Sequence, residues 1–139
     1  MGQTLSIRTR ADLDELPEVV EKLEAFFDDN GVPMPAANHI LMALDEIVAN
    51  IVEHAYAAGE TDPFLKLDAE VDPGQVRMTV ADGGVAFDPL ARAAPDTTLS
   101  VEDRPIGGLG IFLVIKLMDE VAYDRVAHQN RLRIVKNFD

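Results

Sequence analysis

The segment Leu41-Met-Ala-Leu-Asp-Glu-Ile-Val-Ala-Asn-Ile-Val-Glu-His-Ala-Tyr56 decides how this chain folds. Apolar residues recur in it at intervals of three and four, as on the buried face of an α-helix. They are Leu41, Leu44, Val48 and Ile51. We predict a helix that begins near Pro35, runs to about Ala58 and ends at Gly59, because proline suits a first helical turn and glycine a last one.

The same helix carries a second stripe. Glu46, Asn50 and His54 lie four residues apart, so the helix brings them to one face. A carboxylate one turn from a side-chain amide can orient a nucleophile while the amide oxygen binds a hard cation. A solvated polar face gives the same pattern, so the helix alone does not choose between the two interpretations.

The flanking segments predict a small sheet and two more helices. Residues 4–8 alternate as a strand, and residues 12–30 carry the periodicity of an amphipathic helix that ends at Asn30-Gly31. Residues 65–71 and 76–80 read as two strands joined by a tight turn at Asp72-Pro73-Gly74. Residues 107–118 read as a helix, and residues 121–126 and 132–135 as a hairpin around His128-Gln129-Asn130.

This order of elements predicts a fold class. Because the strands alternate between apolar and polar residues, one face of the sheet is expected to be buried and the other solvated. We predict a two-layer α/β sandwich with a mixed, mostly antiparallel sheet and helices on one face. At 139 residues, 47% of them hydrophobic, the chain is expected to form a single domain over residues 1–139.

Composition excludes several classes of function. A net charge of −13 argues against nucleic acid or an anionic membrane as partner, and the absence of cysteine excludes thiolate chemistry. No apolar run approaches the roughly 20 residues of a membrane span, and no secretory signal is evident, so a cytoplasmic location is expected. If so acidic a protein binds a polyphosphate, then backbone N–H groups, a helix N-terminus and a bound cation must supply the attraction.

Two glycine-containing segments suggest where such a ligand binds. In Val80-Ala-Asp-Gly-Gly-Val-Ala-Phe-Asp-Pro89, Asp82 ends a strand and Gly83 and Gly84 follow. The carboxylate can accept a hydrogen bond from an amino group on a flat ring, and the glycines allow that ring to approach the backbone. A glycine turn capped by an aspartate would explain the same residues.

The second segment is Arg104-Pro-Ile-Gly-Gly-Leu-Gly-Ile-Phe-Leu-Val-Ile-Lys116. Its glycines precede an apolar helical run, so unobstructed N–H groups coincide with the positive end of a helix dipole. Such a site can hold phosphates without lysine. The cluster matches neither the dinucleotide pattern, since no strand precedes it, nor a Walker loop, since the Lys-Ser/Thr pair is missing. By itself it is a weak signal.

Taken together and in this order, the three segments resemble the N, G1 and G2 boxes of the GHKL superfamily of ATPases, which contains gyrase, histidine kinases and mismatch-repair ATPases. Within it they are most similar to the anti-sigma-factor serine/threonine kinases. The matching motifs are Asp45-Glu46-x-x-x-Asn50-x-x-x-His54-Ala55-Tyr56, Asp82-x-Gly84-x-x-Phe87-Asp88-Pro89 and Arg104-Pro-Ile-Gly-Gly-Leu-Gly-Ile111. The likeness spans nearly the whole chain and implies the Bergerat ATP-binding fold.

The resemblance also implies roles for single residues. Asn50 would bind a Mg²⁺ ion that bridges the phosphates of ATP, and Glu46 would be the general base. Asp82 would recognise the adenine amino group, and Gly84 would line the base pocket. Residues 90–104 would form a lid, with Arg104 either contacting phosphate or exposed to solvent. The phosphates would be cradled by Gly107, Gly108, Leu109, Gly110 and Ile111.

The implied function is transfer of the γ-phosphate of ATP to a serine or threonine of a small anti-sigma-factor antagonist. Phosphorylation would release the kinase to hold a sigma factor or another signalling target, and a homodimer is a reasonable expectation. The alternative is an ATP-binding switch module that sequesters a partner with little or no phosphate transfer; Glu46 favours the kinase. Many relatives have glycine at the position of Ala86, and the added methyl could narrow the base pocket and weaken ATP binding.

Overall fold

The computed structural model of the chain describes residues 2–56, 63–92 and 106–138, and the side chains of residue 92 and residues 106–109 are not described. The strands in these ranges are β1 (Gln3–Arg10), β2 (Phe64–Asp72), β3 (Gln75–Asp82), β4 (Glu120–Val126) and β5 (Gln129–Asn137). The α-helices are α1 (Leu16–Asp29), α2 (Met34–Asn50) and α3 (Ile106–Leu117). Three short helical turns are η1 (Leu13–Glu15), η2 (Ile51–Ala55) and η3 (Pro89–Arg92).

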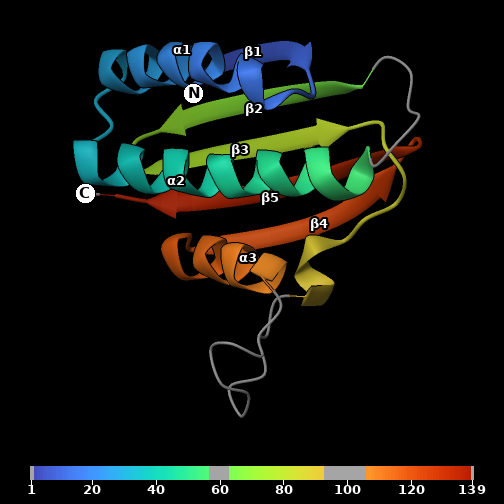
Figure 1. Cartoon of the computed structure of the whole chain (residues 1–139). Coiled ribbons are helices and arrows are strands. Elements are labelled where there is room, and N and C mark those ends of the chain that lie inside the picture. Colours follow the sequence, from blue (N-terminus) through green and yellow to red (C-terminus); the bar gives the residue numbers. More distant parts are fainter. Residues whose placement is uncertain (1, 57–62, 93–105, 139) are drawn as a thin grey trace.

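The strands form one sheet in the order β1-β2-β3-β5-β4, and each of the four pairings is antiparallel. Helix α2 crosses the middle of the sheet, with α1 on one side of it and α3 on the other (Figure 1). The predicted two-layer α/β sandwich, with helices on one face of a mostly antiparallel sheet, is therefore confirmed. The sheet was expected to be mixed, but among the described residues no two strands pair in parallel. β3 is the central strand, so whatever follows its last residue leaves the sheet at its middle.

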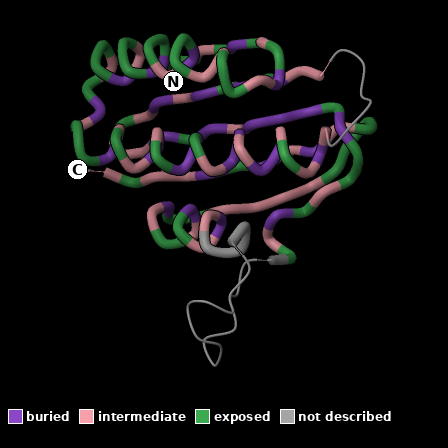
Figure 2. Tube along the Cα trace, viewed as in Figure 1, coloured by how far each residue is buried: buried purple, intermediate pink, exposed green. Residues whose placement is uncertain are grey.

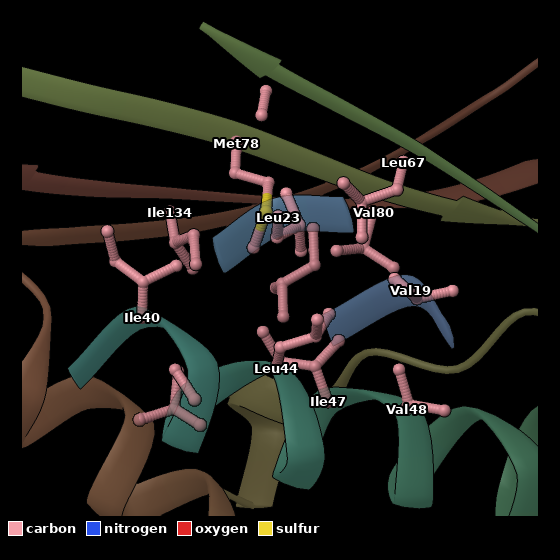
Figure 3. Close-up of a cluster of buried hydrophobic side chains, with 14 of the residues drawn as sticks. Val19, Leu23, Ile40, Leu44, Ile47, Val48, Leu67, Met78, Val80 and Ile134 are labelled. Atoms are coloured by element: carbon pink, nitrogen blue, oxygen red, sulfur yellow. The ribbon is translucent and has the colours of Figure 1, made fainter. Parts of the chain in front are cut away.

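Burial follows the alternation of the strands and the stripe of α2. Along β2 and β3 buried residues alternate with more exposed ones, and the inner side of α2 is buried (Figure 2). In the core, four side chains of α2 belong to the same buried cluster as Met78 and Val80 of β3 (Figure 3). Those four are Ile40, Leu44, Ile47 and Val48. Since all four are at most 2% exposed, this packing fixes the height and rotation of α2 over the sheet.

Local signals set the ends of α1. The Asp12 carboxylate accepts a hydrogen bond from the Asp14 N–H at 2.9 Å, so it caps the turn η1 that leads into the helix. At the other end Gly31 has φ +73°, which glycine adopts without strain. The Val32 N–H then bonds back to the Phe27 carbonyl at 3.0 Å. The predicted end at Asn30-Gly31 is confirmed.

The long central helix changes its geometry after Asn50. Regular α-helical bonding ends there, and η2 is one turn of π-helix, in which the Tyr56 N–H bonds to the Ile51 carbonyl at 3.2 Å. Such turns are rare and are often found at functional sites. The helix therefore extends at least to Ala55 as predicted, whereas its predicted end at Ala58-Gly59 lies outside the described residues.

The last hairpin differs from the prediction in its turn. The turn residues are Ala127 and His128, with φ of 53° and 64°, instead of the predicted residues 128–130. Two residues with positive φ give a tight two-residue connection that suits the twist of the flanking strands. As a result Asn130 belongs to β5, where it lies opposite Asp82 of β3. From the sequence, Asn130 was predicted to lie in the turn, and this placement was wrong.

Candidate functional site

Asp82 is a buried carboxylate at the point where the chain leaves the sheet. Its side chain is only 2% exposed. The oxygen Oδ1 accepts hydrogen bonds from the Gly84 backbone N–H and from Nδ2 of Asn130, both at 2.9 Å. The pairing of β3 with β5 thus brings together one residue that the sequence singled out and one that it did not.

Burial raises the pKa of the Asp82 carboxyl above its ordinary value, because the ionised form loses hydration in the interior. Three interactions act in the opposite direction: the hydrogen bond from Asn130, the hydrogen bond from Gly84 and the positive charge of Arg125. The effect of burial outweighs these three interactions, so the pKa of Asp82 is raised. A buried carboxyl with a shifted pKa that also lines a cavity is typical of a binding site.

The segment after Asp82, which we call the base loop (residues 83–88), is tied to the β4–β5 hairpin. Asn130 donates from Nδ2 to the Val85 carbonyl at 2.8 Å and accepts from the Phe87 N–H at 3.1 Å. Arg125 donates to the Gly84 carbonyl at 3.0 Å. The loop therefore has its backbone groups bonded to side chains of both strands of the hairpin.

The base loop is also tied to the end of the central helix. The Val85 N–H bonds to the Ala55 carbonyl at 3.0 Å, and the Gly83 N–H bonds to the Tyr56 hydroxyl at 2.6 Å. Gly84 lies so close to Ala55 that an added Cβ would overlap its carbonyl group. This contact gives a physical reason for glycine at position 84, independent of the base pocket predicted there.

Asn50 and Asp82, predicted to bind opposite ends of a nucleotide, line the same cavity. Phe87 and Ile111 line it too, and Phe87 stacks on His54 with ring centroids 4.8 Å apart. The cavity measures about 20 Å³, the room that one water needs, so an adenine ring requires its walls to move apart. Ala86 is exposed and is not part of the lining.

The carboxylate of Glu46 lies beside Gly110, near the start of α3. A Cβ added to Gly110 would overlap the Glu46 carboxylate, so the glycine leaves the space that this side chain fills. The first turn of α3 also contains Gly107, Gly108 and Leu109 in its backbone. Because N–H groups at a helix N-terminus are available to anions, this end of α3 agrees with the predicted phosphate cradle, which stays a prediction.

Ile111 and Arg104 were also predicted to lie at the phosphate site, and the structure treats them differently from the glycines. Ile111 is 1% exposed and belongs to the core, so its side chain is not available to a phosphate. Arg104 and residues 93–103 of the predicted lid lie outside the described residues. The described start of the lid is the turn η3, in which Leu90 packs against the core.

The surroundings of Asn50 suit a cation that this side chain would bind together with a ligand. Its side chain is 9% exposed and takes part in no hydrogen bond within the described part of the chain, which leaves its oxygen available. Among the described residues no three His, Cys, Asp or Glu side chains converge as a metal site. Magnesium commonly binds through one or two protein ligands together with phosphates and water, and the chain offers that kind of incomplete site.

A wider hollow lies elsewhere, on the face of the sheet without helices. It measures about 570 Å³, and its lining includes Ser6, Asp68, Arg77 and Arg133. None of the residues that the three motifs single out lines it. It follows from the twist of an uncovered sheet, and the smaller cavity is the better candidate for a nucleotide.

The comparisons with known proteins agree with this geometry. A family model described as a histidine kinase-like ATPase domain matches residues 9–136. The chain belongs to the histidine kinase-like ATPase family. The resemblance inferred from the three motifs is confirmed, and no helix in the described ranges is both long and apolar enough to cross a membrane.

Several relatives of this ATPase domain are named as protein kinases. The chain is 29% identical over 98 residues to the serine/threonine-protein kinase BtrW of Bordetella bronchiseptica, covering 70% of the chain and 68% of that protein. It is 32% identical over 95 residues to the serine-protein kinase RsbW of Listeria monocytogenes, covering 66% of the chain and 60% of that protein. It is 26% identical over 121 residues to the serine-protein kinase RsbW of Staphylococcus aureus, covering 84% of the chain and 76% of that protein.

Solved structures show the same fold. A chain with the RsbU and RsbW domains of a Mycobacterium tuberculosis protein superposes with a TM-score of 0.68 at 18% identity, covering 98% of this chain and 32% of that one. The histidine kinase domain of a blue-light-activated kinase from Erythrobacter litoralis gives 0.56 at 17% identity, covering 88% and 61%. The ATPase domain thus spans about a third of the first of these two chains.

Proposed function

We propose that the protein is an ATP-dependent serine/threonine protein kinase that acts on a small regulatory partner of the anti-sigma-factor antagonist type. Membership of the ATPase family and relatives named as serine kinases support this reading. The observation that carries it is the shared cavity of Asp82 and Asn50, with Glu46 one helical turn before Asn50 and against Gly110. A binding module without transfer has no need for a carboxylate at that place.

The proposed roles follow the geometry. Asp82 accepts a hydrogen bond from the adenine amino group, and Gly84 lets the base loop lie close to η2. Asn50 holds Mg²⁺, which when bound neutralises charge on the triphosphate. The backbone from Gly107 to Ile111 faces the phosphates, with Arg104 as the nearest cation in the sequence.

Glu46 acts on the acceptor. The hydroxyl oxygen of the partner's serine or threonine attacks the γ-phosphorus, and the bond from that phosphorus to the β–γ bridging oxygen breaks. ADP leaves with the bond's electron pair, and Glu46 receives the hydroxyl proton. Phosphoryl transfer depends mainly on positioning and charge neutralisation, which this small domain offers through one amide, one carboxylate and a helix N-terminus.

In the cell, the partner would be an antagonist protein whose phosphorylation releases the kinase to bind a sigma factor or another signalling protein. The second candidate is a switch module that binds ATP and sequesters a partner without efficient transfer. The small volume of the cavity favours this candidate, since a site that must open for its base can couple nucleotide binding to partner binding.

The test is incubation of the protein with γ-labelled ATP, Mg²⁺ and a purified antagonist-type protein. We expect label on the antagonist and its loss in Glu46→Gln, by about 10²–10⁴-fold if Glu46 is the general base. ATP affinity of Glu46→Gln, measured by calorimetry, is expected to stay near that of the parent. Tight ATP binding with no label on any partner would replace the kinase with the switch.

A further inference from the structure

Asn130 is placed and bonded in a way that its position in the sequence does not suggest. It is 5% exposed and lies directly opposite Asp82 in the pairing of β3 with β5. Both of its N–H groups are used, one by Oδ1 of Asp82 at 2.9 Å and one by the Val85 carbonyl at 2.8 Å. One small side chain therefore bonds to the carboxylate and to the loop that follows it.

The oxygen of the Asn130 amide accepts three hydrogen bonds. The donors are the Phe87 N–H at 3.1 Å, the Tyr123 hydroxyl at 2.6 Å and Nη1 of Arg125 at 3.0 Å. A backbone N–H and a guanidinium can only donate, so a reversed amide would place N–H groups against N–H groups. The network thus fixes the orientation of the amide and directs its N–H groups to Asp82 and Val85.

The full use of the Asn130 amide in these hydrogen bonds limits how the residue can act on a ligand. Because both N–H groups of Asn130 are committed, the residue has none left for a nucleotide and can act on it only through the groups that it holds, Asp82 and the base loop. On Asp82, the hydrogen bonds from Gly84 and Asn130 both end on Oδ1. Neither of them uses Oδ2, which leaves that oxygen as the acceptor for an amino group of the base.

We propose that Asn130 is the positioning residue of the base site, which holds the Asp82 carboxylate so that one oxygen stays available to the adenine amino group. This inference rests on the ATP-binding part of the proposed function but not on phosphate transfer. The second strand of the hairpin, and not only the three motifs, then determines nucleotide affinity. Arg125 and Tyr123 act one step further out, by fixing Asn130.

A double-mutant cycle tests the proposal. The affinity for Mg-ATP is measured by calorimetry for the parent, Asn130→Ala, Asp82→Ala and the double variant. We expect Asn130→Ala to weaken binding about tenfold or more in the parent and no more than about twofold when Asp82 is already alanine, since residues that act as a unit are not additive. Equal losses in both backgrounds would mean that Asn130 only supports the fold.

A matched control comes from the same strand. Asn137 is an exposed residue of β5 whose side chain accepts a hydrogen bond from Gln75 at 3.0 Å, at the far end of the pairing with β3. Asn137→Ala is expected to bind ATP like the parent. If Asn130→Ala fails to unfold cooperatively, Asn130→Thr takes its place in the cycle, because threonine suits a strand and has a hydroxyl in place of the amide.

The outcomes separate this proposal from the proposed function. ATP binding by the parent without label transfer to an antagonist overturns the kinase and leaves the role of Asn130 standing. Transfer by the parent together with additive losses in the cycle overturns the role of Asn130 and leaves the kinase standing. Absence of any ATP binding by the parent overturns both.

Discussion

The base end and the phosphate end of the candidate site differ in how much the protein completes by itself. At the base end, Asp82 and the base loop are held by hydrogen bonds from β4, β5 and η2. At the phosphate end, Asn50 and Glu46 have no side-chain hydrogen bond within the described ranges, and Glu46 only fills the space beside Gly110. The proposed base end is preorganised, whereas the proposed phosphate end offers an amide and a carboxylate without side-chain hydrogen bonds in the described ranges, as expected of a site that a cation and a triphosphate would complete.

The largest effect is expected at the phosphate end. Asn50→Ala removes the only side chain there that we assign to Mg²⁺, so the gain in ATP affinity on adding Mg²⁺ should disappear. Loss of an outer-shell partner of a metal already costs about 10–100-fold, so the loss here should be at least about 100-fold. Calorimetry with and without Mg²⁺ measures it, and undiminished affinity would show that the metal assignment is wrong.

Asp82→Asn tests the base end. The asparagine keeps an oxygen for Gly84 and Asn130 but loses the charge, and hydrogen bonds to charged groups are worth about 1.5–3 kcal/mol. ATP affinity should fall by roughly 10–100-fold. GTP competing as well as ATP in the parent protein would contradict the adenine contact.

The pKa of Asp82 adds two expectations to the same variant. Recognition needs the ionised carboxylate, so the advantage of the parent over Asp82→Asn should shrink as the pH falls, beginning at a higher pH than for an exposed aspartate. A raised pKa in the folded state means that stability falls as the pH rises through it. At neutral pH Asp82→Asn should therefore melt no lower than the parent, and a clearly lower melting temperature would contradict this account.

Gly110→Ala asks whether the phosphate end depends on the contact with Glu46. The new methyl overlaps the carboxylate and should displace it. We expect phosphate transfer to fall by about tenfold, within the range of general-base effects, with a smaller change in ATP affinity. Leu113→Ala, at an exposed position of the same helix, is the control. Equal losses of affinity and transfer would point to disruption of the helix instead.

The smallest effect is expected in the turn between β4 and β5. Ala127 and His128 both have positive φ, which non-glycine residues adopt at a cost of about 1 kcal/mol or more. Replacing them by Asn-Gly, the preferred pair for such turns, should raise stability by about 1 kcal/mol, or a few degrees in melting temperature. ATP affinity should not improve, because hydrogen bonds already hold Asp82 and the base loop in place. A large gain in affinity would show that these groups are not held in the parent protein.

Most of the fold could be predicted from the sequence because its signals are local. The stripe of α2, the alternation of β2 and β3 and the end of α1 at Gly31 each follow from spacing or from a single residue. The π turn after Asn50 could not be predicted, since the spacing of apolar residues does not distinguish one π turn from a continuing α-helix. The turn at Ala127-His128 was missed because a positive φ is uncommon for alanine.

The candidate site was predictable on its motif side only. Glu46, Asn50 and Asp82 stand out because the segments that carry them, taken together with the glycines of residues 107–110, match the motifs of the ATPase family. Asn130 and Arg125 did not stand out, because the register between β3 and β5 decides what lies opposite Asp82. These two strands are separated in the chain by α3 and β4, so no local signal sets that register.

The π turn of Ile51–Ala55 makes the molecule sensitive to the length of one segment. Because the π turn already holds one residue more than an α-helical turn, it has no regular bonding left that would take up another. Each helical residue advances the chain by about 100° and 1.5 Å, so one residue inserted after Val52 would rotate all that follows by more than a quarter turn. The Ala55 carbonyl would leave Val85, and the Tyr56 hydroxyl would leave Gly83, while Asn50 would keep its place. Such a one-residue insertion should release the base loop and leave Asn50 unaffected.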